Sequence, residues 1–538
     1  MVEMSTPAPL AATVRLRLFY LAAGAIGTLI VFGMRLALAS RVEFCGWRDA
    51  CFYDTLARQL ADHRGFVVPF VWNYQVGDIN LPNPALEYWR PGMSLILALP
   101  AVFDRSVTLF SGAVLDALAT VMLSLSAAWL AWRTTADRMA TLLAYLLCLS
   151  LAPLWTMPLT PDSALFYAVA VAWFLALVAV ERRSLGVELF GVALIGVAYF
   201  IRNDAIVLGA ALAGIVVLRL VAARGADFGD EARRAVVLGI AFVAALLPTH
   251  LLLYAVNGHF LNSAIDRVIF LDSLDDFRRY GGAVDFATWS DAGVAALVKV
   301  RLVALFTTLR ALFLMCGQFP TLLALLGAAI VAMRRRSRYG GWFIGPALFF
   351  VALLASYIMV LPVIADHAVP RSAAALLPAC AVLAVIAVRE TVASARTGAL
   401  MVGAAMILGA IHGLSMAHGL LDHFHQLHTQ YLAEAQLIED NVGKGRRIIA
   451  MVENPAPFTA TTGIPSVPLP NNGVAAAKQA IAHYDVTAVV APEWQGGRAL
   501  AAALSATDIS GVPGTTEIVI AVPPQHAADR QTGATASR

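Results

Sequence analysis

The sequence predicts a polytopic α-helical membrane protein that ends in a small α/β domain. Of its 538 residues, 59% are hydrophobic and only 14% are charged, whereas soluble domains carry roughly a quarter charged residues. Hydropathy predicts about eleven membrane-spanning helices, because a span needs about 20 apolar residues, or fewer where it is short and tilted. The net charge of +3 gives no reason to expect nucleic-acid binding, and five cysteines are too few for a disulfide-built scaffold.

The basic loops set the expected orientation. The predicted spans lie near residues 18–38, 107–132, 139–153, 163–180, 185–200, 205–221, 235–256, 320–333, 342–362, 372–388 and 397–417. If they alternate in direction, the arginines near residues 15–17, 133–138, 182–183, 224–234, 334–338 and 389–396 share one side. Lys and Arg accumulate in cytoplasmic loops. We therefore expect a multi-pass protein of the plasma (inner) membrane with its N-terminus inside. Loop 41–91 and an interfacial segment at 257–318 then lie outside.

The chain after residue 417 has the composition of a soluble domain. Apolar, β-like runs at 446–453, 486–491 and 516–522 alternate with helical segments at 473–483 and 498–505. This alternation predicts an extracytoplasmic α/β domain over residues 418–524, after a membrane domain over residues 1–417. The polar end of the chain, 525–538, is expected to be disordered.

Loop 41–91 is rich in charged and aromatic residues in an otherwise apolar chain, and it carries the first candidate for chemistry. A helix is predicted from Asp49, since Phe52, Leu56 and Leu60 share one face of it. The apolar stripe suggests a helix that lies on the membrane surface. Asp49 either caps this helix and favours its dipole, or acts as a general base beside the membrane. Asp54 is a competing acid, which could equally be a solvated surface residue.

Two cysteines flank this acid. Cys45 and Cys51 lie on the expected oxidising side of the membrane, where a disulfide would close a short loop and fix the entry of the chain into the helix. Two reduced, buried thiols are the alternative.

The other candidates lie in loops on the same predicted face. Asp162, in Thr160-Pro161-Asp162, either starts a helix or contributes a second acid. Arginine matches phosphate oxygens through paired N–H donors, so outer cations could hold a lipid phosphate, although interfacial arginines also extend to water without binding anything. Arg202 lies beside Asp204. An arginine that only extends to water needs no neighbouring acid, so this pair favours a binding role. The candidate cations are Arg90, Arg202, His367 and Arg371.

Five histidines cluster in a late stretch of the chain. Their spacing matches a closed zinc site poorly, and a polar helix leaving the membrane explains them equally well. The chain has no Walker loop, dinucleotide fingerprint or nucleophile elbow. The histidines are His412, His418, His423, His425 and His428.

The order of these motifs resembles the GT-C superfamily of polyprenyl-phosphate-sugar-dependent glycosyltransferases. The closest likeness is to its protein-mannosyltransferase-like and aminoarabinose-transferase-like branch. Relatives open with one span and an outer loop that carries an acid and, four residues on, a tyrosine, here Asp49 and Tyr53. The segments 160–164, 196–204 and 367–378 resemble later outer-loop elements. The sequence departs from the pattern at Ala50, where relatives often have Glu, at Arg90, where lysine is usual, and at Ser372, where tyrosine is usual.

The resemblance implies a reaction and roles for these residues. A polyprenyl-phosphate-linked sugar is the donor, and a hydroxyl or amine of a lipid, glycan or protein attacks its anomeric carbon with inversion. Asp49 is the implied base, and Asp162 orients sugar or acceptor. No cofactor is required by the motifs, and a divalent metal ion is the one alternative left open. The candidate substrate-binding residues are Tyr53, Asp54, Arg90, Arg202, Asp204, His367 and Arg371.

Two other functions remain as alternatives. A lipid or sugar transporter or flippase would explain the spans, but it predicts two related halves and polar residues near the middle of the membrane. A non-catalytic membrane protein with a degenerate site would explain Ala50. Convergence of Asp49, Asp162 and Arg371 in one place at the outer leaflet would favour the enzyme.

Overall fold

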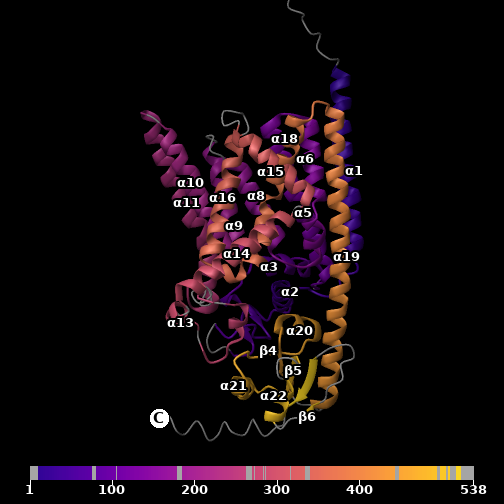
Figure 1. Ribbon diagram of the computed structural model, residues 1–538, viewed down its shortest axis with the longest axis vertical. Helices are drawn as coiled ribbons and strands as arrows, with labels where there is room; N and C mark the ends of the chain where they lie inside the picture. Colours follow the sequence, from indigo (N-terminus) through magenta and orange to yellow (C-terminus); the bar gives the residue numbers. More distant parts are fainter. Residues whose placement is uncertain are drawn as a thin grey trace, which may run out of the picture.

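The computed structural model is a tall helical bundle with a small α/β module at one end (Figure 1). This end of the bundle is called the module end below. The structure describes residues 10–75, 80–104, 106–178, 184–223, 225–261, 270–271, 273–282, 284, 286–291, 293–315, 317–333, 340–442, 447–492, 497–504, 507–508 and 517–522. The predicted disordered end, 525–538, lies outside these residues.

The described helices confirm the expectation of a polytopic membrane protein. Seven are long and apolar enough to cross a membrane, and two bent pairs raise the count to nine, compared with about eleven expected. The two shorter apolar helices, α8 and α9, account for the difference. The long helices are α1 (Leu10–Ala39), α5 (Leu109–Thr135), α10 (Val207–Ala222), α11 (Ala226–Asn257), α16 (Gly340–Met359), α18 (Leu377–Thr391) and α19 (Ala395–Val442), and the others are α6 (Arg138–Ser150), α7 (Pro153–Thr156), α8 (Ala164–Leu177), α9 (Leu185–Ile201), α14 (Gly293–Met315) and α15 (Gln318–Met333).

One bent pair differs from the sequence prediction. The expected interfacial segment at 257–318 contains α14, which joins α15 at an angle of 102° and passes the test for a span only together with it. Hydropathy did not predict α14 as part of a span, because its basic residues lower its apolar character.

Short elements fill the module end of the bundle. They connect the long helices, and α3 and β1 among them pack against α2. These elements are α2 (Arg48–Ala61), β1 (Val67–Val68), β2 (Asn83–Pro84), η1 (Ala85–Glu87), α3 (Gly92–Ala98), α4 (Ala101–Asp104), η2 (Met157–Leu159), η3 (Asn203–Ile206), η4 (Leu274–Arg278), α13 (Phe286–Asp291), η5 (Pro362–Ile364), α17 (Ala365–Ala373) and η6 (Ala374–Leu376).

The C-terminal module contains a five-stranded sheet in the order β4-β3-β5-β7-β6. Strand β3 runs parallel to β4 and β5, whereas β7 is antiparallel to β5 and β6. The three apolar runs and two helices predicted from the sequence are present, but α20, β4 and β6 were not predicted. The elements are β3 (Ala450–Val452), α20 (Pro455–Thr462), β4 (Ser466–Pro468), α21 (Val474–Tyr484), β5 (Ala488–Pro492), α22 (Gly497–Ala503), β6 (Thr507–Asp508) and β7 (Glu517–Ala521).

The sheet is buried on both faces. In β3, Ala450 and Val452 belong to the core that includes α2 and the second half of α19, whereas Met451 belongs to the core beneath α21 and α22. Helix α19 is continuous through residue 418, so the predicted domain boundary falls inside it, and its second half runs beside the module (Figure 1). The module therefore shares a core with the membrane domain.

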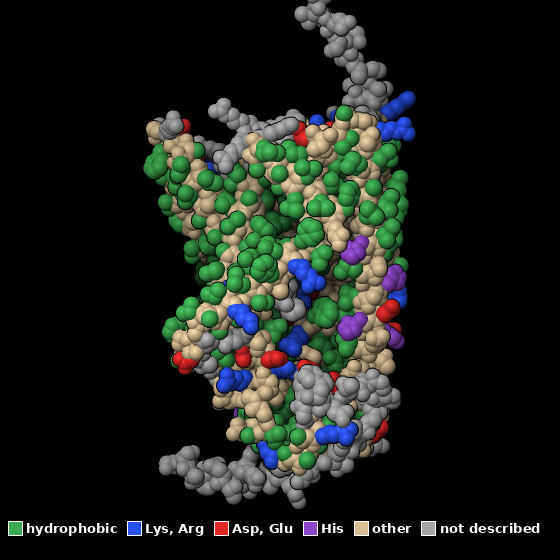
Figure 2. All heavy atoms as spheres, viewed as in Figure 1, with side chains coloured by type: hydrophobic (Ala, Val, Ile, Leu, Met, Phe, Trp, Pro, Cys, Tyr) green, Lys and Arg blue, Asp and Glu red, His purple; other side chains and the backbone are tan. Residues whose placement is uncertain are grey.

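The surface has the polarity of a membrane protein. Figure 2 shows hydrophobic side chains over the upper part of one face, where the long helices lie, while most charged side chains lie lower, near α13 and the module. An apolar surface of this kind is what lipid covers.

A contact between two carboxyl groups, one of them buried, joins α19 to the module. Glu434 on α19 is 1% exposed and accepts a hydrogen bond from Gln430 Nε2 at 2.7 Å. Burial and a hydrogen bond with Glu517 of β7 raise the pKa of Glu434 to about 10, compared with an ordinary value of 4.5. Because the folded-state pKa is the higher one, this contact stabilises the fold fully below about pH 4.5, and its contribution falls as pH rises toward 10.

We expect Glu434→Gln to remove this pH dependence. Glutamine keeps the hydrogen bonds but has no proton to lose, so the variant should gain thermal stability relative to wild type as pH rises from 5 to 9. Melting temperatures of the intact protein at pH 5, 7 and 9 measure the gain, with Glu439→Gln on the exposed side of α19 as control. If the difference in melting temperature between wild type and Glu434→Gln stays constant across this pH range, Glu434 does not titrate there.

The structure decides between a disulfide and two reduced thiols at Cys45 and Cys51. Cys45 and Cys51 form a disulfide, with their Cα atoms 4.9 Å apart, immediately before and inside α2. Cys148 and Cys380 are free, and Cys316 lies outside the described residues.

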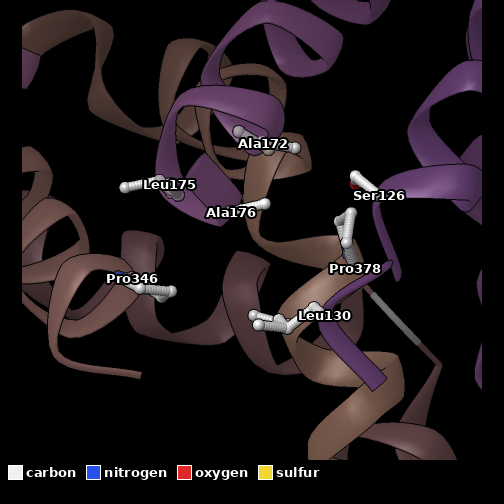
Figure 3. Close-up of a pocket in the computed structure, with 9 residues that line it drawn as sticks. Ser126, Leu130, Ala172, Leu175, Ala176, Pro346 and Pro378 are labelled. Atoms are coloured by element: carbon white, nitrogen blue, oxygen red, sulfur yellow. The ribbon is translucent and has the colours of Figure 1, made fainter. Parts of the chain in front are cut away.

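An apolar cavity lies between α5, α8, α16 and α18. None of its lining residues is titratable. Figure 3 shows Ser126 and Leu130 of α5 on one side and Ala172 and Ala176 of α8 on the other. The cavity therefore offers no group for acid–base chemistry.

Candidate active site

Five charged side chains form one continuous network at the module end of the bundle. Arg371 lies between two acids: its Nη1 is 2.6 Å from Asp49 Oδ2, and its Nε is 3.2 Å from Asp162 Oδ2. Arg202 Nη1 is 4.0 Å from Asp162 Oδ1, and Arg202 Nε is 3.1 Å from Asp204 Oδ1. Charges therefore alternate from Asp49 through Arg371, Asp162 and Arg202 to Asp204.

The network is assembled from the ends of apolar helices. Asp49 follows α1, Asp162 precedes α8, Arg202 directly follows α9, and Arg371 lies in α17 shortly before α18. Each helix contributes one or two charged residues where its apolar stretch stops. The sequence predicted this placement on one face, and the structure brings Asp49, Asp162, Arg202, Asp204 and Arg371 together.

Helix α2 presents Asp49 to this network. The helix begins after Trp47, and no side chain caps its first turn. Asp49 lies in that turn and is 31% exposed at its side chain, and its carboxylate accepts a hydrogen bond from Arg371. Asp49 is therefore not the capping residue of α2. Its negative charge in the first turn still favours the helix dipole.

The body of α2 is more buried than predicted. All residues from Ala50 to Ala57 are buried, since the helix packs against α3 on one side and α20 on another. Phe52 stacks on Trp89 with ring centroids 4.2 Å apart. The helix thus does not lie free on a membrane surface, and the module covers the part of it that carries Asp49.

Polar contacts also tie the module to the start of α2 and to η4. Arg48 Nε donates to Asn454 Oδ1 at 2.8 Å, and Arg278 Nη1 donates to Glu453 Oε1 at 2.8 Å. Because Arg48 precedes Asp49 in the chain, movement of the module would move the candidate base.

Asp162 is held in its ionised form despite being buried. Its side chain is 7% exposed, and it accepts a hydrogen bond from Ser163 Oγ at 3.0 Å. Burial opposes ionisation, but the charges of Arg371 and Arg202 outweigh it and lower the pKa of this carboxyl below its ordinary value. A buried carboxylate between two guanidinium groups is well suited to fix their positions.

Residues that the sequence did not single out complete the far end of the network. Tyr357 Oη donates to Asp204 Oδ2 at 3.0 Å, and Ser372 Oγ also donates to this oxygen. The two hydroxyls come from different helices, Tyr357 from α16 and Ser372 from α17. Tyr357 was not predicted because it lies near the end of an apolar span.

A further acid lies close by inside α5. Asp116 is fully buried, and neither of its carboxylate oxygens has a hydrogen-bond partner within the described part of the chain. Asp162 is the charged group that acts on it. The sequence reading missed it because it lies within a predicted span.

Two other predicted site residues have partners outside the network. Asp54 is not a solvated acid, since it is 2% exposed and binds Arg58 Nε at 2.9 Å, and burial raises its pKa in spite of this partner. Arg90 contacts Tyr199, with its Nη2 2.6 Å from the hydroxyl and its guanidinium 4.4 Å from the ring centroid. His367 is in α17, but its side chain lies outside the described part.

Tyr53 lies within electrostatic range of the network. It is 3% exposed, and burial together with the negative charge of Asp49 raises the pKa of its hydroxyl, so it stays neutral. It can therefore donate a hydrogen bond to a substrate but cannot serve as a base at physiological pH.

The donor set does not fit a divalent metal ion. No group of three or more His, Cys, Asp or Glu side chains in the described residues could hold a metal. A cationic guanidinium already occupies the space between Asp49 and Asp162, and a second cation there would be repelled. On α19, His425 Nδ1 lies 3.0 Å from Glu43 Oε2, with both side chains exposed.

Solved structures show where this fold occurs. The first match is ArnT from Cupriavidus metallidurans bound to undecaprenyl phosphate, with a TM-score of 0.57 at 13% identity, covering 94% of this chain and 99% of that one. The same protein in the apo state matches with a TM-score of 0.55 at 14% identity, covering 96% and 99%. Neither a scan of protein-family models nor a search of curated proteins found a match. The likeness shows that the chain has the GT-C fold over nearly its whole length.

Proposed function

We propose that this chain, which has the GT-C fold, is an inverting glycosyltransferase that uses a polyprenyl-phosphate-linked sugar. The observation that carries the proposal is the placement of Asp49, Arg371 and Asp162 in one network at the ends of apolar helices. A lipid-linked donor needs this arrangement, with a phosphate at the membrane boundary and a base within reach of it. ArnT, whose fold this chain shares, has been crystallised with undecaprenyl phosphate.

The proposed reaction is a single displacement. An acceptor hydroxyl or amine attacks the anomeric carbon, the bond from this carbon to the phosphate oxygen breaks, and the polyprenyl phosphate leaves with the electron pair. Asp49 takes the proton of the acceptor, and its partial exposure leaves room for the acceptor to approach. Asp162 does not take part in proton transfer, because both of its oxygens accept contacts from cations or Ser163.

The arginines receive the charge that develops on the leaving phosphate. Arg371 presents a planar fork of donors next to Asp49, so it can hold a phosphate oxygen while the base works beside it. Arg202 is oriented by Asp204 and Ser163, with its Nη1 3.2 Å from Ser163 Oγ. Cations that neutralise the phosphate remove the need for an acid that protonates the leaving group. Tyr53, Arg90 and His367 are proposed to line the same site.

The geometry favours an enzyme over a transporter. The network lies where helices end at the module end, whereas a transporter holds its charged residues near the middle of the membrane. We place this end on the extracytoplasmic face of the inner membrane, with the N-terminus in the cytoplasm. The proposed domains are a catalytic membrane domain over 1–417 and an outer domain over 418–524, joined by the continuous helix α19.

Mass analysis of envelope lipids, glycans and proteins tests the proposal in cells. A strain that lacks this chain should lose one sugar modification and accumulate its polyprenyl-phosphate-linked donor, and expression of the wild-type chain should restore the modification. Loss of a lipid species from one leaflet without any change in glycosylation would instead support a flippase.

A further inference from the structure

Helix α6 ends inside the membrane domain. It has 13 residues, so at 1.5 Å per residue it covers about 20 Å of a hydrocarbon layer that is about 30 Å thick. After Ser150 the helix direction changes by 56°, and the chain continues through α7 and η2 to Asp162. The last four carbonyls of a helix have no partner within it, and within a membrane no bulk water can satisfy them.

All four of these carbonyls are nevertheless satisfied. The carbonyl of Leu147 accepts from Ser150 Oγ at 2.9 Å, and that of Cys148 accepts from the Leu151 amide at 3.2 Å. The carbonyl of Leu149 accepts from Arg35 Nη2 at 2.7 Å, and that of Ser150 accepts from Trp155 Nε1 at 3.2 Å. Three of the four donors come from outside α6: the amide of Leu151, which directly follows the helix, Arg35 of α1 and Trp155 of α7.

Arg35 connects these donors. Its guanidinium lies 5.1 Å from the centroid of the Trp155 ring, and its Nη1 donates to Thr120 Oγ1 of α5. One side chain thus joins α1, α5, α6 and α7.

The burial of Arg35 is costly and requires an explanation. Its side chain is 2% exposed, and no carboxylate forms an ion pair with it among the described residues. A charge buried in a membrane domain without a counter-ion is expensive, and such residues generally serve a function. The compensation here comes from the negative end of the α6 dipole, a hydroxyl and an aromatic face. Helix α1 is otherwise mostly exposed, since only 11% of its apolar window is buried.

We propose that Arg35 is a positioning residue for Asp162, which acts through the broken span between α6 and α8. By closing the end of α6 and orienting Trp155, Arg35 fixes the direction in which the chain leaves the break. Asp162 lies only a few residues beyond η2, so this direction determines where it meets Arg371 and Arg202. This inference rests on the proposed function for its catalytic consequence, but its structural part stands independently.

Hydrogen exchange and kinetics of the full chain in lipid nanodiscs test the inference. In Arg35→Met, amides 151–163 should exchange at least about tenfold faster. The Leu149 carbonyl loses its donor, and Trp155, which donates to the Ser150 carbonyl, loses the guanidinium that lies over its ring. The kcat for sugar transfer should fall by about 10²-fold, the scale of a misplacement of about 1 Å, with little change in the KM for the donor. Arg35→Lys keeps a cation with a donor nitrogen, and should restore most of the slow exchange at 151–163 and most of kcat.

A matched control separates positioning from general destabilisation. Arg219 is another buried arginine of the membrane domain, 5% exposed, which binds Glu188 at 2.9 Å between α10 and α9. Arg219→Met should loosen α9–α11 without accelerating exchange at 151–163. Equal exchange at 151–163 in wild type and Arg35→Met would overturn the inference, as would faster exchange throughout the protein. If wild type transfers no sugar, the proposed function fails, while the exchange result still decides what Arg35 does.

Discussion

Asp49→Asn is expected to lower the rate of sugar transfer by about 10²–10⁴-fold, the usual contribution of a general base. Asparagine has nearly the same shape and can still accept a hydrogen bond from Arg371, but it cannot take a proton from the acceptor. The variant should therefore fold normally and bind the lipid-linked donor. Steady-state transfer by the purified protein, with donor binding and melting temperature measured in parallel, tests this expectation.

Asp54→Asn is the matched control for this experiment. Asp54 lies on the same helix but faces Arg58 rather than the network, so its loss should reduce stability slightly and leave transfer nearly unchanged. The opposite pattern, with transfer lost in Asp54→Asn and retained in Asp49→Asn, would show that the wrong acid has been assigned.

Arg371→Ala is expected to have an effect of similar size for a different reason. The change removes the only cation that contacts both Asp49 and Asp162 in the described network. The two carboxylates would then repel each other, and the leaving phosphate would lose a charged donor worth about 10²–10³-fold in rate. Both the KM for the donor and kcat should worsen, whereas Asp49→Asn should affect mainly kcat.

Arg371→Lys distinguishes charge from geometry at this position. Lysine supplies a point charge but cannot reach two carboxylates with a planar fork of donors. It should therefore recover part of the donor affinity lost in Arg371→Ala and little of kcat. Full recovery of both would indicate that Arg371 contributes only its charge, and normal transfer by Arg371→Ala would remove it from the active site.

The membrane architecture was largely predictable because apolar length is a local property. Each span expected from hydropathy coincides with an apolar helix, and the helix that begins near Asp49 was predicted from the spacing of Phe52 and Leu56. The membership of Asp49, Asp162 and Arg371 in one site followed from the alternation of loops between the two membrane faces. The order of motifs along the chain then pointed to the GT-C fold.

Pairings between distant helices were not predictable in this way. Asp49 and Arg371 are 322 positions apart, and only the packing of α17 against the bundle decides which acid this arginine meets. Burial of α2 beneath α20 likewise depends on the module, whose short strands β4 and β6 lack a sequence signal. Asp116 and Arg35 were overlooked because a single polar residue hardly changes the hydropathy of a long apolar segment.

Transfer by the purified chain from a polyprenyl-phosphate-linked sugar tests the central claim most directly. The protein in liposomes, supplied with the donor and acceptor fractions from the deletion strain, should release polyprenyl phosphate in equal amount to glycosylated product, with the anomeric configuration inverted. Asp49→Asn protein prepared in the same way should release neither above background. Product formed with retained configuration, or at the same rate by wild type and Asp49→Asn, would contradict an inverting transferase that uses Asp49 as its base.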